Sequence, residues 1–223
     1  MPRIHYQQRL AELKNKLLAM AALAQQTLGC AMDGYMNGDM VLLHHVQENE
    51  TAINAAQRSV DEMAYDLMAM EQPMAIDLRF LLAVIKINGD LERIGDQSVN
   101  IAERAADLLS RPAADLPVNL RQMSDLTEKM IRFALQSLLD GDAAMAKSVL
   151  ALDDDVDQMN RDIHKAMIAM IQQKPQWTAQ ALSIVIISRN LERIADHATN
   201  IAEDVIFWVH GADVRHHLSL ATD

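Results

Sequence analysis

Cysteine, aromatic side chains and turn-forming residues are all scarce in this sequence of 223 residues. Cys30 is the only cysteine, which excludes a disulfide within the chain and a cysteine-rich metal site. Aromatic residues make up 4% of the chain, and its 7 glycines and 5 prolines leave few positions for turns. The residues that favour helices, above all Ala, Leu, Met, Gln and Glu, are abundant. The composition therefore predicts an all-α protein.

Positive charge and long apolar runs are lacking as well. The net charge of −11 at pH 7 argues against a nucleic-acid-binding protein, which would normally present a basic face. The longest apolar runs, near residues 81–87 and 181–187, are far shorter than the roughly 20 residues needed to cross a bilayer. No apolar signal region follows the first residues. We therefore expect a soluble, cytoplasmic protein.

Apolar residues recur at helical spacing along nearly the whole chain and are interrupted at only a few places. Gly38-Asp39 and Gly141-Asp142, which align at an offset of 103, each place a good N-cap after a residue that tolerates a left-handed conformation. Gln72-Pro73, Lys174-Pro175 and the proline-containing stretch 110–117 are the other interruptions. Together they predict six helices, over residues 4–36, 39–71, 75–110, 117–140, 142–173 and 177–210.

The chain also repeats itself. Of the fifteen residues in 91–105, nine are identical to those in 191–205 at an offset of 100. Long helices joined by short turns must lie antiparallel, so each group of three forms a bundle. We therefore predict two tandem antiparallel three-helix bundles of long helices that arose by internal duplication, over residues 1–112 and 113–223.

Most of the identical residues in this repeat are polar, whereas a repeat kept only for packing would retain mainly apolar ones. On a helix, four polar residues of the first copy fall within about 80° of one another and form a stripe: Glu92, Asp96, Asn100 and Glu103. The second copy supplies the same stripe: Glu192, Asp196, Asn200 and Glu203. The opposite face of the first copy is expected to enter the core: Leu91, Ile94, Ser98, Ile101 and Ala105.

Carboxylates one helical turn apart repel each other unless something compensates their charge. Arginines on the same helices are one possible compensator: Arg93, Arg104, Arg189 and Arg193. A bound cation is the other, because carboxylate and amide oxygens suit hard metals such as Mg²⁺, Ca²⁺ or Mn²⁺, and iron also fits. A cation needs ligands from more than one helix, and the second helix of each half offers them: Glu50, Asn54, Asp153 and Asp157. The plainer alternative is a pair of solvated acidic faces.

An enzyme is not indicated by these residues. A ferritin-like di-iron site is disfavoured because no Glu-x-x-His sequence occurs in the chain. The chain also has neither a glycine-rich phosphate loop nor a nucleotide-binding fingerprint.

The doubled Glu-x-x-x-Asp motif, Glu92 to Asp96 and Glu192 to Asp196, resembles the signature of the PhoU family of phosphate-uptake regulators. Each copy lies late in a three-helix unit, as in that family. Further similar segments cover nearly the whole chain: Pro73, Asp77-Leu78-Arg79, Val84-Ile85-Lys86, Asp90, Trp208-Val209-His210-Gly211 and Asp213-Val214-Arg215-His216. The chain departs from the family at Ala195, where glycine is frequent.

The resemblance implies a regulator without catalytic activity that keeps phosphate uptake and phosphate-starvation signalling low. It implies three partners: the ATP-binding subunit of the phosphate transporter, the phosphate-sensing histidine kinase and a second copy in a homodimer. Contact with the membrane would then be only indirect. Some members of that family carry metal clusters on the acidic motifs and others are metal-free, so for cations on these motifs we consider Mg, Mn, Ca, Fe or Zn. The alternative hypothesis is a metal-binding or metal-storage helical protein with an indirect effect on phosphate.

Overall fold

The computed structural model of the protein describes residues 2–71 and 73–211, without the side chains of Pro2, Arg3 and Glu71. The segment 213–216, which contributed to the family resemblance, lies outside the described residues. Six long α-helices follow one another: α1 (Pro2–Asn37), α2 (Met40–Glu71), α3 (Ala75–Leu109), α4 (Leu120–Asp140), α5 (Ala143–Gln173) and α6 (Thr178–His210). A single 3-10 turn, η1 (Pro175–Trp177), precedes α6, and the described ranges contain no strand. The predicted all-α class is confirmed.

Five of the six predicted helices agree with the structure to within two residues at each end. The predicted start of the fourth helix at residue 117 was wrong, because α4 begins at Leu120. Asn119 has an extended backbone, and its side-chain oxygen accepts a hydrogen bond of 3.0 Å from the Arg121 N–H. Since this bond satisfies a free N–H of the first turn, Asn119 is the N-cap and the preceding residues stay outside the helix.

Both Gly-Asp pairs form the tight turns that the sequence predicts. Gly38 and Gly141 have φ angles of 67° and 64°, which side chains with a Cβ rarely adopt. Asp39 then accepts a hydrogen bond of 2.8 Å from the Val41 N–H, and Asp142 accepts one of 2.9 Å from the Ala144 N–H. The glycine reverses the chain and the aspartate caps the next helix, so the second helix of each bundle returns directly along the first.

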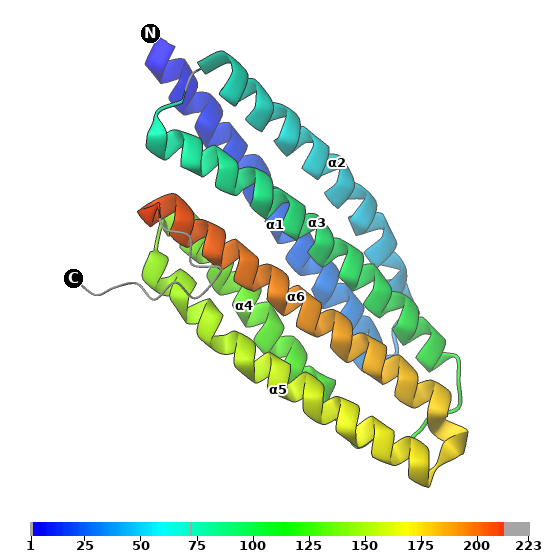
Figure 1. The fold of residues 1–223 in the computed structure, drawn as a ribbon. Coiled ribbons are helices and arrows are strands. Elements are labelled where there is room, and N and C mark those ends of the chain that lie inside the picture. Colours follow the sequence, from blue (N-terminus) through cyan, green and yellow to red (C-terminus); the bar gives the residue numbers. More distant parts are fainter. Residues whose placement is uncertain (1, 72, 212–223) are drawn as a thin grey trace, which may run out of the picture.

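The six helices form two bundles that lie side by side with their long axes roughly aligned (Figure 1). The first bundle contains α1, α2 and α3, and the second contains α4, α5 and α6. α3 and α6 run antiparallel in the middle and make the most extensive contact between the bundles, while α1 and α4 lie behind them and also touch. The predicted domain boundary between residues 112 and 113 falls in the connection from α3 to α4 and stays a prediction.

The face of α3 that was predicted to enter the core is fully buried. Leu91, Ile94, Ser98, Ile101 and Ala105 all have 0% exposure. α2 approaches this face closely at Gly95, where an added Cβ would come within 2.9 Å of the Cδ1 atom of Ile53. None of the helices in the described part of the chain is long and apolar enough to span a membrane.

Candidate functional site

The two polar stripes lie on the same face of the molecule. Each stripe occupies the side of its helix opposite to the buried residues, with Glu92 of α3 near Glu50 of α2 and Asp196 of α6 near Asp157 of α5. Figure 1 shows α2, α3, α6 and α5 in this order across the molecule, with α1 and α4 behind α3 and α6. This four-helix face, formed by α2, α3, α6 and α5, is the candidate functional surface.

We call the space between α2 and α3 the first groove and the space between α5 and α6 the second groove. The second groove brings its predicted residues close together. Burial raises the pKa of Asp153, and the nearby carboxylates of Asp196 and Asp157 raise it further. Burial likewise raises the pKa of Asp196, with Asp157 as the next cause. The pKa of Glu192 is raised by burial first and then by Asp196. Four carboxyl groups from two helices therefore share one partly buried groove and repel each other.

The first groove, between α2 and α3, has a weaker version of the same arrangement. Burial raises the pKa of Glu92, and Asp96 and then Glu50 of α2 add to the shift, while Arg93 and His197 oppose it. The Asn54 amide donates a hydrogen bond to the Glu50 carboxylate one turn away. Asn54 stands where the second groove has Asp157, so the first groove carries one carboxylate fewer.

The remaining predicted residues lie further along the two stripes. Asn100 and Glu103 of α3 are exposed, and Glu103 lines a shallow pocket of about 300 Å³ beside the start of α2. Asn200 of α6 is exposed and Glu203 is half-buried. These four residues therefore extend each groove along its helix.

Arginines compensate part of the negative charge, as one of the two hypotheses expects. Arg93 lies 3.5 Å from the Glu92 carboxylate and 3.2 Å from that of Asp96. Arg189 lies 2.6 Å from the Glu192 carboxylate. Arg193 also lowers the pKa of Glu192 and Asp196 through its charge. Arg104 acts on Asp107 through its charge, and its predicted role on the stripe stays a prediction.

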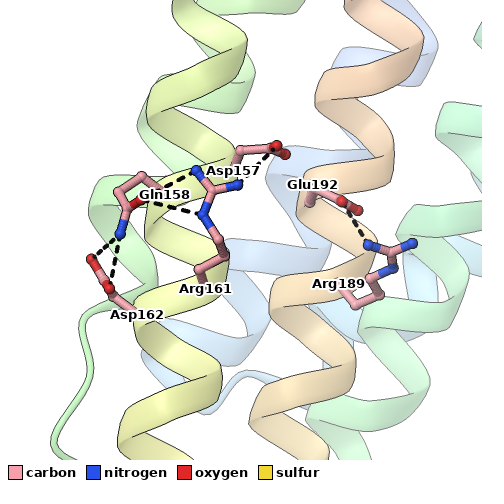
Figure 2. A network of polar contacts seen from close by, with 6 residues as sticks. All are labelled: Asp157, Gln158, Arg161, Asp162, Arg189 and Glu192. Atoms are coloured by element: carbon pink, nitrogen blue, oxygen red, sulfur yellow. Dashed lines mark hydrogen bonds and ion pairs between the residues drawn. The ribbon is translucent and has the colours of Figure 1, made fainter.

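A further arginine, which the sequence did not single out, belongs to α5. Arg161 contacts the Asp157 carboxylate at 3.2 Å and also donates to the Gln158 side chain, which in turn donates to Asp162 (Figure 2). Figure 2 shows the Asp157 side chain pointing from α5 toward α6, where Glu192 is bound by Arg189. The spacing of four residues between Asp157 and Arg161 was the available signal in the sequence.

The compensation is incomplete in the second groove. One carboxylate oxygen of Glu192, Oε2, is buried and has no hydrogen-bond partner. Carboxylate and amide oxygens are ligands that hard cations accept, so the donor set fits the predicted metals. Within residues 2–71 and 73–211, however, no group of three or more His, Cys, Asp and Glu side chains is arranged to hold a metal ion. The predicted ligands line two open grooves, and cation binding stays a prediction.

The contact between the bundles contains a group of polar residues, of which the sequence analysis did not single out His197 and Asp204. His197 Nδ1 lies 2.8 Å from the Asp90 carboxylate, and the Asn200 amide donates to the same oxygen at 3.1 Å. Lys86 lies 2.9 Å from the buried carboxylate of Asp204. The side-chain oxygen of Asn200 takes no part in this bond and can accept other contacts. The second groove is thus connected to α3 of the other bundle.

Fold and site together define a duplicated, all-helical protein with paired acidic grooves on one face. The family model of the PhoU domain matches the chain twice, over residues 17–105 and 120–205. The chain therefore belongs to the PhoU family, as its doubled motif predicts.

Proteins of known family and solved structures agree with this assignment. The chain is 35% identical over 93% of its length, and over 81% of the other protein, to the phosphate-specific transport system accessory protein PhoU homolog of Pseudomonas putida. A PhoU homolog 1 from Thermotoga maritima is 29% identical over 96% of this chain and 93% of its own. The crystal structure of PhoU from Pseudomonas aeruginosa superposes with a TM-score of 0.89 at 32% identity, covering 93% of this chain and all of that one. That of the phosphate transport system regulatory protein PhoU from Streptococcus pneumoniae gives 0.86 at 26% identity, over 94% and 99% of the two chains.

Proposed function

We propose that this protein is a non-catalytic accessory protein of a phosphate-specific transport system, which lowers phosphate uptake and phosphate-starvation signalling when phosphate is plentiful. The observation that carries this proposal is the match of the PhoU domain to both halves of the chain. Relatives similar over nearly the full chain are named as accessory proteins of that system, and one structural neighbour is named as a regulatory protein of it.

The proposed partners are the ATP-binding subunit of the phosphate transporter, the phosphate-sensing histidine kinase and a second copy of this chain. The proposed place of action is the cytoplasm, and contact with the membrane is indirect, through the first two partners. Two side-by-side bundles with a broad four-helix face support this role, because such a face offers a partner a wide and preformed surface.

The proposed ligands of the two grooves are divalent or iron-type cations. In the second groove Asp153, Asp157, Glu192 and Asp196 would hold the cation, which would neutralise carboxylates that now raise one another's pKa values. The unpartnered Glu192 oxygen supports this proposal. In the first groove the amide of Asn54 replaces a carboxylate, so we expect weaker binding there.

Alkaline phosphatase activity, or another phosphate-starvation reporter, tests the regulatory role in cells that lack the gene and grow with abundant phosphate. We expect high activity that falls when the intact gene is restored. Unchanged activity in the deletion strain would refute the proposed regulation.

A metal-storage protein is the second candidate, favoured because neighbouring carboxylates raise pKa values in both grooves. A variant in which Glu92, Asp96, Glu192 and Asp196 are all replaced by alanine separates the two candidates. If the variant no longer binds metal but still restores low reporter activity, regulation does not depend on metal storage. If metal binding and regulation are lost together while the helices remain folded, the storage hypothesis gains support.

A further inference from the structure

An approximate two-fold axis relates the two bundles. α3 and α6 are antiparallel, with Asp90 against His197 and Asp107 against Ser183. In this register Ile94 lies opposite its repeat equivalent Ile194, so the two copies of the motif meet in the middle of the contact. Rotation by 180° about an axis through that point, perpendicular to both helices, exchanges one bundle with the other. The axis emerges on the four-helix face.

Exposed apolar side chains on this face follow the same symmetry. Tyr65 of α2 is 53% exposed, and Ile168, its equivalent at the offset of 103, is 57% exposed. Leu82 of α3 is 40% exposed, and Leu182, its equivalent at the offset of 100, is 49% exposed. Two apolar patches result, the α2/α3 patch (Tyr65, Leu78 and Leu82) and the α5/α6 patch (Ile168, Leu182 and Ile186). Two members of each patch are equivalent, whereas Leu78 and Ile186 correspond to Thr178 and Lys86.

Helix geometry places both patches in line with the acidic grooves. Leu82 lies about 40° around α3 from Asp96, and Leu182 has the same relation to Asp196 on α6. Tyr65 lies one turn beyond Asp61, whose carboxylate accepts a hydrogen bond of 2.9 Å from Asn88 of α3. The side of α2 that carries Tyr65 therefore faces α3, near the level of Leu82. Each groove is thus acidic near the axis and apolar at the end where its patch lies.

The spacing of the patches follows from the register. Leu82 and Leu182 each lie twelve residues before the isoleucine at the axis, in opposite directions. At 1.5 Å per residue they are about 36 Å apart along the helices, or about 18 Å on either side of the axis. Acidic stripes occupy the space between them, and these would repel the same face of a second copy of this chain.

We propose that the four-helix face binds one two-fold-symmetric protein dimer, with the dimer axis on the axis between the bundles. The dimer would present basic residues near its own axis and one apolar residue or cluster about 18 Å to each side. A symmetric partner offers the same contact twice, and the duplicated chain meets it with equivalent patches. This inference rests on the proposed function, because the dimer it describes is the pair of ATP-binding subunits of the phosphate transporter.

Binding to the assembled phosphate transporter in detergent, with both of its ATP-binding subunits, tests the proposal. The buffer contains EDTA, so that the groove carboxylates keep their own charge. The variants are Leu82→Glu, Leu182→Glu and the combination of both. Met70→Glu is the matched control, because Met70 is an exposed apolar residue of α2 that lies about 140° around the helix from Tyr65.

We expect each single variant to weaken binding about tenfold and the double variant about a hundredfold, while Met70→Glu stays within about twofold of the unchanged protein. One chain should contact both ATP-binding subunits of the pair through this face. Circular dichroism and urea unfolding of each variant verify that the helices are intact.

Three results would overturn the inference. Binding that persists in the double variant would show that the patches are not used. A large loss in one single variant and none in the other would exclude a symmetric partner on this axis. If the unchanged protein did not bind the transporter at all, the proposed partner itself would fall together with the inference.

Discussion

Replacing Gly95 with alanine tests how closely α2 and α3 approach each other. In a helix interior this change alone stabilises by about 0.5–1 kcal/mol, because glycine loses more backbone entropy on folding. Here the new Cβ would come within 2.9 Å of Ile53 Cδ1 and 3.5 Å of its Cγ2. Ile53 has 0% exposure, so it must shift within a packed core, and such overpacking costs about 1–3 kcal/mol. We therefore expect Gly95→Ala to lower the free energy of unfolding by about 1 kcal/mol.

The second bundle shows how the strain is relieved. Its equivalents of Ile53 and Gly95 are Val156 and Ala195, so the smaller core residue accompanies the larger helix residue. Ile53→Val alone removes a buried methyl group and should cost about 0.5–1.5 kcal/mol. In the double variant the missing Cδ1 makes room for the alanine Cβ. We expect its stability to lie within about 1 kcal/mol of the unchanged protein, which gives a coupling energy of about 1–2 kcal/mol between the two positions.

Urea unfolding followed by circular dichroism measures the stability of the unchanged protein, the two single variants and the double variant. Gly89→Ala is the control, because Gly89 lies in the same helix and an added Cβ there meets nothing within 4 Å. We expect this control to stabilise the protein by about 0.5–1 kcal/mol. Stabilisation by Gly95→Ala to the same extent, or strict additivity with Ile53→Val, would show that α2 does not press on α3 at this point.

Three further predictions concern the turns and the grooves. Asp142→Ala should lower the free energy of unfolding by about 1 kcal/mol, because the Ala144 and Met145 N–H groups lose their acceptor; an unchanged urea midpoint would contradict this. Asp196→Asn should be more stable than the unchanged protein at pH 7 in EDTA. Because the pKa of Asp196 is raised in the folded state, the protonated side chain contributes its full stability below the usual pKa of 3.8, and this contribution is lost as pH rises through the folded-state pKa. The advantage of the variant should therefore vanish near pH 3, and a constant difference in stability across pH would refute this. Mn²⁺ at about a hundredfold excess over its Kd should raise the free energy of unfolding by about 2.7 kcal/mol. The double variant Asp153→Asn with Glu192→Gln should remove this effect more completely than Glu50→Gln with Glu92→Gln. Equal stabilisation of the unchanged protein and both double variants would exclude the second groove as the stronger site.

Helices and turns were predictable because each depends on residues close together in the chain. The Gly-Asp pairs carry both the left-handed residue and the cap, and the apolar spacing of α3 identifies its buried side. The start of α4 was not predictable to the residue, because Pro117 and Asn119 are both plausible first-turn signals and only the structure shows that Asn119 caps the helix.

The grooves were predictable in part. The offset of 103 brought Asp153 and Asp157 into the prediction, and the structure places them beside Glu192 and Asp196. The contact between α3 and α6 was not predictable, because polar residues at helical spacing read as a solvated face. Lys86 and Asp90 have that spacing, and nothing in the sequence shows that Asp204 and His197 cover them.

Divergence between the two copies makes this contact unequal on the two sides of the axis. Asp90 and His197 pair on one side, whereas their equivalents, Asn190 and Gln97, do not bond to each other: Asn190 donates to a carbonyl of its own helix, and the Gln97 oxygen has no partner. Lys86 and Asp204 add an ion pair to the first side. On the other side the Ser183 hydroxyl donates to the Asp107 carboxylate at 3.2 Å, a bond in which only the acceptor is charged. The first side has an ion pair with both partners charged and two further bonds to Asp90, so more charged contacts hold the first half of α3 to the last half of α6 than hold the opposite ends together. Because Asn200 belongs to the first side, a cation that draws on its oxygen would act directly on the contact between the bundles.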